Sequence, residues 1–281
     1  MNTYWTGYYT SRPSLKYLAL RAHVFLQVVK QLTVLSRMSD FYELHLLRHA
    51  VALVLHHDAI TGTSQHHVAN DFIRLLSEAI DGCTRKVSQF LSILTPTWGG
   101  NRRPKTNQQF VVCHQLNISQ CRFTETQDTI LLLVYNQLSI KTYFHIRLPA
   151  IALHYSIRDF NDEEVEYQLV PLPASVINLP GRKSTAIQEL CFEAENIPPL
   201  GYTAYYITPI RDQLAEGAFV KKSSNIDAES EVSPFISNEY IKLTVDEKTG
   251  LLESIQHVDG VKILISQNFY FYSQTQQGLQ S

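Results

Sequence analysis

The chain has 281 residues, of which 44% are hydrophobic and 18% are charged, a composition typical of a folded protein with two or more domains. Its 24 basic and 26 acidic residues give a net charge of −2, so electrostatics offer no reason to expect DNA, RNA or an anionic membrane as partner. No uninterrupted apolar stretch approaches the ~20 residues of a membrane-spanning helix, and residues 1–7 lack the basic and apolar regions of a signal peptide.

Three apolar stripes at steps of three and four residues predict three amphipathic helices between residues 12 and 95. The stripes run from Leu15 to Leu32, from Phe41 to Val54 and from Val68 to Leu94. Ser11 and Pro13 suit the cap and first turn of the first helix, and Thr63 and Ser64 suit the start of the third. Short connections between such helices predict an antiparallel three-helix bundle over residues 1–95.

The pattern changes after the bundle. Residues 96–109 are rich in Gly, Asn, Arg and Pro, which predicts a linker. From residue 110 to 211, short β-rich segments alternate with Pro and Gly, and these predict a small antiparallel β domain.

A second β region is expected over residues 235–281. Residues 240–245 and 251–255 flank a Lys-Thr-Gly turn and predict a hairpin. A sheet that begins near residue 240 cannot close within the remaining residues at ~5 to 6 residues per strand, so we expect the start of a larger, incomplete β-sandwich. The expected fold class is therefore multidomain α+β: a three-helix bundle followed by antiparallel β-sandwich-type domains, the last one truncated.

Cys113 and Cys121 bracket Asn117, which begins an Asn-Ile-Ser acceptor sequence for N-linked sugar. Two cysteines eight residues apart around a polar loop suit a local disulfide, and disulfides form in oxidising compartments. Both features favour a protein of the secretory pathway. Cys83 and Cys191 remain as buried thiols or as partners of cysteines elsewhere.

His56, His57 and Asp58 stand in a row where the second apolar stripe stops. Imidazole and carboxylate groups can bind a metal and hydrogen-bond a polyhydroxylated ligand. Consecutive residues on a helix point ~100° apart, so these three side chains cannot all face one metal, and the row can supply one ligand and two differently directed polar groups. These residues therefore predict a partial site that another domain completes, unless the histidines only cap the helix end, where they favour its dipole.

Two segments carry a resemblance to a known family. Residues 4–13 (YWTGYYTSRP) and residues 56–63 (HHDAITGT) resemble the class II α-mannosidases, the family 38 glycoside hydrolases. Residues 66–71 and 115–119 continue the likeness, and the latter are most similar to the lysosomal branch. The resemblance covers essentially the whole chain, as the middle helical domain and the first part of the C-terminal β region.

The resemblance implies a zinc site that is shared between domains. In that family, one zinc ion is held by a His and two Asp of an N-terminal α/β domain and by a second His of the middle domain, which matches His57 here. His56 and Asp58 match residues that hydrogen-bond the bound mannose, and Trp5 matches an aromatic residue that lines the pocket. The two catalytic aspartates belong to the N-terminal domain, so the resemblance implies no catalytic residue in this chain.

We therefore expect a fragment of a zinc-dependent retaining α-mannosidase, lysosomal or secreted, that hydrolyses terminal α-D-mannosyl residues of N-glycans and oligomannosides. Its partners would be a mannose-containing oligosaccharide and the N-terminal α/β domain of the same protein, and the isolated chain would be inactive. Two other interpretations remain open: a non-catalytic glycan-binding or scaffolding remnant of that family, and an unrelated helical-plus-β interaction module.

Overall fold

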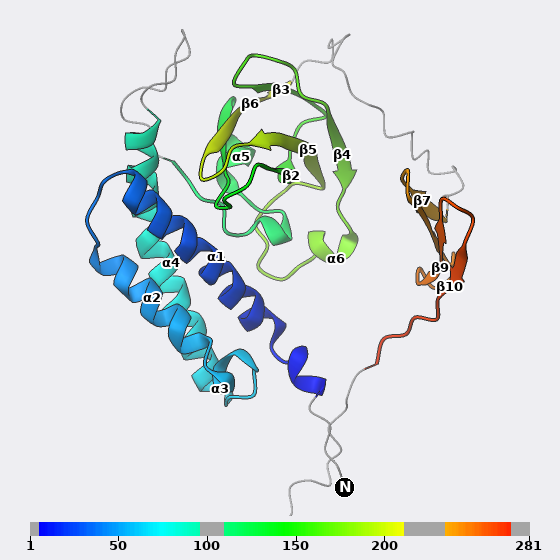
Figure 1. The fold of residues 1–281 in the computed structure, drawn as a ribbon, viewed down its shortest axis with the longest axis horizontal. Helices are drawn as coiled ribbons and strands as arrows, with labels where there is room; N and C mark the ends of the chain where they lie inside the picture. Colours follow the sequence, from blue (N-terminus) through cyan, green and yellow to red (C-terminus); the bar gives the residue numbers. More distant parts are fainter. Residues whose placement is uncertain (1–5, 96–109, 211–233, 271–281) are drawn as a thin grey trace, which may run out of the picture. The chain divides into compact units, whose positions relative to one another are not determined.

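The computed structural model describes residues 6–95, 110–210 and 234–270. The chain divides into two compact units, Met1–Lys222 and Ser223–Ser281. In the first unit a group of helices precedes two antiparallel three-stranded sheets, and the second unit contains a four-stranded antiparallel sheet (Figure 1). This combination of helices and antiparallel sheets confirms the expected α+β class.

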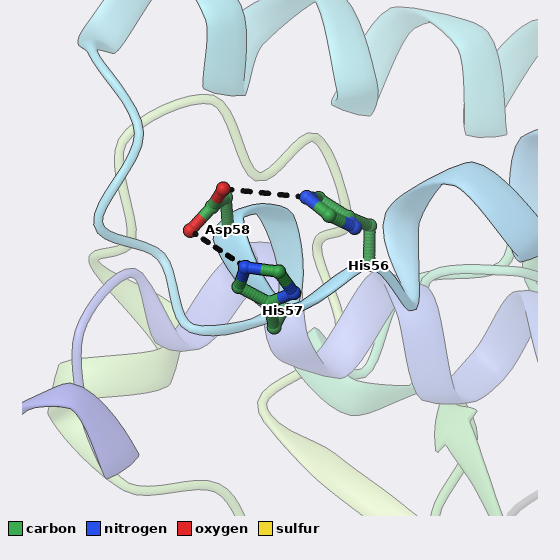
Figure 2. Close-up of side chains that lie close together, drawn as sticks. All are labelled: His56, His57 and Asp58. Atoms are coloured by element: carbon green, nitrogen blue, oxygen red, sulfur yellow. Dashed lines mark hydrogen bonds and ion pairs between the residues drawn. The ribbon is translucent and has the colours of Figure 1, made fainter.

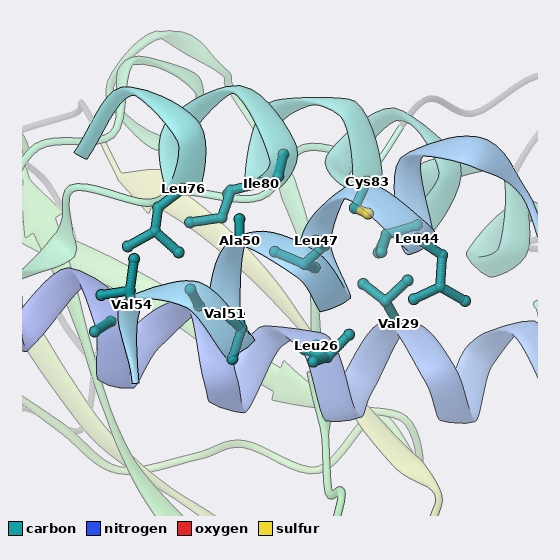
Figure 3. Packing of buried hydrophobic residues seen from close by; sticks show 14 of the residues in the cluster. Leu26, Val29, Leu44, Leu47, Ala50, Val51, Val54, Leu76, Ile80 and Cys83 are labelled. Carbon is teal, nitrogen blue, oxygen red and sulfur yellow. The ribbon is translucent and has the colours of Figure 1, made fainter. Parts of the chain in front are cut away.

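Three long helices open the first unit: α1 (Pro13–Leu35), α2 (Tyr42–Val54) and α4 (His66–Leu94). They pack against one another in alternating directions (Figure 1), with the 3-10 helix η1 (Thr6–Tyr9) before α1 and the one-turn helix α3 (His57–Ile60) between α2 and α4. Because the apolar residues of each helix recur on one face, all three faces can leave water together. The buried side chains of this core (Figure 3) include Leu26, Val29, Leu44, Leu47, Ala50, Val51, Val54, Leu76, Ile80 and Cys83.

The helix starts differ from the sequence prediction. The cap position of α1 is Arg12, in the left-handed region at φ 46°, and Ser11 precedes it. Helix α4 begins at His66 rather than at Thr63 or Ser64. The Ser64 hydroxyl donates to the backbone carbonyl of Asp58 instead, so this side chain stabilises the loop before the helix.

Helix α1 corrects the expectation that no segment is long and apolar enough to cross a membrane. Its 23 residues pass that test by length and composition, with a mean hydropathy of 1.3 over 18 residues. The sequence argument counted only uninterrupted apolar runs, whereas α1 interrupts its apolar residues with a few charged ones. The core helix of a bundle passes the same test, and α1 buries Leu15, Ala22 and Val29 against α2 and α4.

Six strands form the β part of the first unit. They are β1 (Ile130–Tyr135), β2 (Thr142–Ala150), β3 (His154–Asp159), β4 (Tyr167–Pro171), β5 (Gln188–Ile197) and β6 (Tyr202–Ile210). The sheets have the orders β1-β6-β3 and β2-β5-β4, and residues from both contribute to one apolar core. Three short helices accompany them: η2 (Leu116–Ile118), α5 (Arg122–Thr126) and α6 (Ala174–Ile177).

The second unit is a meander of β7 (Phe235–Ser237), β8 (Ile241–Val245), β9 (Leu252–His257) and β10 (Lys262–Leu264). Strands β8 and β9 pair around the turn that the Lys-Thr-Gly sequence predicts. Gly250 has a φ of +68° there, and the Asp246 carboxylate accepts hydrogen bonds from the backbone N–H groups of Lys248 and Thr249. The local turn chemistry thus fixes the register of this hairpin.

Polar contacts join the helices to the β part within the first unit. The Tyr135 hydroxyl donates to Gln31 Oε1 at 3.0 Å, and Gln31 Nε2 donates to the carbonyl of Gln137 at 3.0 Å. His114 Nε2 lies 3.0 Å from the Thr84 hydroxyl on α4. Since Thr84 already donates to the carbonyl of Ile80, its oxygen is free to accept from a neutral His114 ring.

The burial of His114 predicts an acid-sensitive junction. Burial lowers the pKa of His114, the charge of Asp81 opposes this shift, and the charge of Arg21 adds to it. A folded-state pKa below the unfolded value of ~6.5 means that the unfolded chain binds more protons, so the associated stability is present above pH ~6.5 and is lost as pH falls through the folded pKa. Urea unfolding at pH 7.5 and pH 5.0 should show a smaller acid-induced loss for His114→Gln than for wild type. His49→Gln, at an exposed position on α2, serves as the control, and equal losses in both variants would contradict the assignment.

Candidate functional site

The candidate site lies in the loop that joins α2 to α4. Helix α2 ends at Val54, and the N–H of His56 closes it by donating to the carbonyl of Leu53. His56 then takes an extended conformation (φ −57°, ψ 140°) and its carbonyl accepts from the N–H groups of Ala59 and Ile60, so it caps the new helix α3. Ala59 is fully buried and anchors α3 to the molecule. The chain therefore changes direction at His56 instead of continuing as one helix.

This change of direction overturns the expectation that the two histidines and Asp58 diverge. His56 Nε2 lies 3.3 Å from Asp58 Oδ2, and His57 Nε2 lies 3.5 Å from Asp58 Oδ1, with the carboxylate next to both rings (Figure 2). One potential ligand atom from each residue lies within 4.8 Å of the others. The ~100° divergence applies within a helix, and His56 stands before the first turn of α3.

The three groups fit a partial zinc site. Zinc binds imidazole nitrogen and carboxylate oxygen, and these three residues offer both kinds of ligand atom within 4.8 Å of one another. The side chains remain open to solvent, with exposed fractions of 53% for His56, 81% for His57 and 72% for Asp58. Open donors leave room for further ligands from outside the loop. Among the described residues this is the one group of three or more His, Cys, Asp or Glu side chains that could hold a metal ion.

The other sequence-derived candidates lie elsewhere. Trp5 falls outside the described residues. Cys113 and Cys121 are joined by a disulfide with a Cα–Cα distance of 5.5 Å, and Asn117 is exposed on η2 between them. Cys83 is buried as a free thiol, and burial raises its pKa to about 12.

Four residues next to the site had no role at the site assigned from sequence: Ser11, Arg12, Lys16 and Gly62. Their polar atoms meet at the backbone that follows α3. Ser11 and Arg12 stand inside one of the two segments that resemble the family, and Gly62 stands inside the other. This resemblance was the signal in the sequence that could have linked them to the site. Nothing in periodicity or spacing could have indicated that these segments touch, because the contact joins residues about 50 positions apart.

Comparison with known proteins agrees with this part of the fold. Residues 3–94 match the family described as "Alpha mannosidase middle domain", and residues 165–207 match "Lysosomal alpha-mannosidase-like, central domain". The resemblance to the lysosomal α-mannosidases is confirmed. The lysosomal alpha-mannosidase of Bos taurus is 32% identical over 277 residues, and that of Homo sapiens is 31% identical over 281 residues; each alignment covers 96% of this chain.

The chain spans about a quarter of the length of these curated relatives, 25% of the bovine and 26% of the human protein. Among solved structures, an alpha-mannosidase from Enterococcus faecalis is similar with a TM-score of 0.47 and 13% identity, over 92% of this chain and 30% of the other.

We predict that the disulfide stabilises the loop that presents Asn117. Replacing both Cys113 and Cys121 with Ser should lower the free energy of unfolding by roughly 2 to 3 kcal/mol, since closing a loop of this size restricts the unfolded chain. Urea unfolding under non-reducing conditions measures the loss. Cys191→Ser, which removes a free and half-buried thiol, is the control. Peptide mapping that finds both thiols free in secreted protein would refute the pairing.

Proposed function

We propose that residues 56–58 supply part of the metal- and sugar-binding site of a zinc-dependent retaining α-mannosidase acting on terminal α-D-mannosyl residues of N-glycans and oligomannosides. One observation carries the proposal: two imidazoles and a carboxylate converge at an exposed turn of a segment that matches the α-mannosidase middle domain. In this proposal His57 is the metal ligand, and His56, Asp58 and Trp5 contact the sugar.

The different exposures support this division of roles. His57 is the more exposed imidazole and is therefore the more accessible to a metal that other residues also bind. The Asp58 carboxylate lies beside both rings and can accept hydrogen bonds from sugar hydroxyls. A bound zinc ion would supply a template and a Lewis acid for the sugar oxygens. The remaining ligands would come from an α/β domain such as the one that precedes the middle domain in the family.

The cellular setting is part of the same proposal. The similar proteins of Bos taurus and Homo sapiens are named as lysosomal, and a disulfide is stable in the oxidising secretory pathway. An exposed Asn117 within an acceptor sequence is compatible with glycosylation on that route. We therefore place the protein in the lysosome or outside the cell.

The isolated chain should not hydrolyse an aryl α-mannoside. Retaining hydrolysis requires two carboxyl groups ~5 to 5.5 Å apart, and the described cluster contains only the carboxylate of Asp58. The measurement is release of the aryl group with and without added zinc, with a complete lysosomal α-mannosidase as the positive control. Robust zinc-dependent turnover by the 281-residue chain would contradict the proposal. Binding of mannosides that does not depend on metal would instead favour a glycan-binding remnant.

The two histidines should respond differently to substitution. With Co²⁺ as a spectroscopic probe, His57→Ala should abolish the weak metal binding of the chain, because it removes the proposed ligand. His56→Ala should leave most of it, and His49→Ala, at an exposed position on α2, should leave all of it. Isothermal titration and the visible cobalt spectrum report the result. Equal losses in the first two variants would show that both imidazoles bind the metal, and a greater loss in His56→Ala would reverse the assignment.

A further inference from the structure

The loop that carries the histidines is attached to the start of α1 through two backbone carbonyls. Lys16 Nζ donates to the carbonyl of Thr61 at 2.8 Å. The Ser11 hydroxyl donates to the carbonyl of Gly62 at 3.0 Å, and the Arg12 guanidinium donates to the same oxygen. We call this group of Ser11, Arg12, Lys16, Thr61 and Gly62 the carbonyl clamp.

The clamp meets the end of α3, where a helix leaves acceptors without partners. Thr61 is the C-cap residue of α3, and the carbonyls at the end of a helix need donors from elsewhere. Cationic side chains are suited to that position because they also oppose the negative end of the helix. Each of these hydrogen bonds is charge-assisted when a Lys or Arg donates it, which makes it stronger than a neutral one.

Gly62 allows the loop to lie close to the start of α1. Its φ is +72°, and a Cβ atom at this position would lie 2.5 Å from the carbonyl oxygen of Ser11 and 3.1 Å from Lys16 Nζ. The first distance is shorter than a Cβ contact tolerates, and the obstacle is backbone. A side chain at residue 62 would therefore push the loop away from α1.

Within the described part of the chain, no ion pair links Arg12 or Lys16 to a carboxylate. Partial burial, and then the neighbouring charge of Arg12, lowers the pKa of Lys16. Both cations instead donate to carbonyls of the loop backbone, and Lys16 also donates to the carbonyl of Ser11. Hydrogen bonds from two charged side chains to the loop carbonyls can fix the position of the turn that carries the proposed metal site.

We propose that Arg12, Lys16 and Gly62 are positioning residues that hold α3 against the start of α1, so that His56, His57 and Asp58 stay close together and His57 can bind metal. The inference rests on the proposed metal site, since it assigns the clamp a role in metal affinity. The inference also makes a prediction that does not involve metal: without the clamp, the hydrogen bonds within α3 should open more often.

The test compares two matched pairs of variants of the 281-residue chain. Gly62→Ala is paired with Gly181→Ala, a glycine that also has a positive φ (+85°) but has nothing within 4 Å of its missing Cβ. Lys16→Met is paired with Lys30→Met, since Lys30 is exposed on the same helix and contacts only the Gln27 side chain among the contacts described. Lys16→Arg tests whether a different cationic donor rescues the effect.

Two readouts separate the clamp from the metal site. The first is Co²⁺ affinity by isothermal titration, which should fall about tenfold or more in Gly62→Ala and Lys16→Met, stay unchanged in the controls and recover in Lys16→Arg, as for residues that support metal ligands. The second is amide hydrogen exchange without metal at Ala59 and Ile60, which should become faster in the same two variants.

Each outcome decides one of the claims. Co²⁺ affinities and exchange rates that match the controls in both variants would overturn the clamp. If the wild-type chain binds no Co²⁺ at all, the proposed metal site fails, and the exchange rates alone then decide whether the clamp holds α3. Faster exchange with unchanged Co²⁺ affinity would overturn the proposed role in metal binding.

Discussion

The close packing of α1, α2 and α4 determines where every group of the candidate site can lie. Small residues line the core face of these helices and let the backbones approach: Ala19, Ala22, Ala50, Ala69, Ala79 and Gly82 are buried. A Cβ atom on Gly82 would lie 3.1 Å from the Glu43 side chain, a tight contact, so the glycine lets α4 lie close to α2. Because the helices cannot shift independently, the end of α2 and the start of α4 are fixed points for the loop between them.

The loop combines a small apolar contact with polar ones. Ala59 is fully buried and Ile60 packs against the bundle core, while hydrogen bonds to the carbonyls of Asp58, Thr61 and Gly62 supply further contacts. A rigid bundle therefore supports a turn whose exposed side chains are free for binding. Functional sites commonly have this arrangement, in which a packed scaffold positions residues on loops.

The sequence predicted the parts of the fold that have a periodic signal. Apolar stripes located the three long helices, and the turn around Gly250 located the β8–β9 hairpin. Helix α3 was not predicted, because four residues are too few to show a helical period. The close approach of His56 to Asp58 was not predicted either, because it depends on the extended backbone of His56. The contact of Lys16 with Thr61 joins segments far apart in the chain, and no local pattern of residues encodes such a meeting.

The exposure of the three donors distinguishes this turn from a closed structural metal site. A structural zinc ion is enclosed by about four protein ligands, and it stabilises the fold that surrounds it. Here the buried core of the bundle consists of apolar side chains, and more than half of each of the His56, His57 and Asp58 side chains is exposed. A metal bound at this turn would therefore add little to the stability of the bundle and would keep coordination positions open. Open positions are what a catalytic or ligand-binding metal requires, so the geometry favours a role in binding over a role in folding.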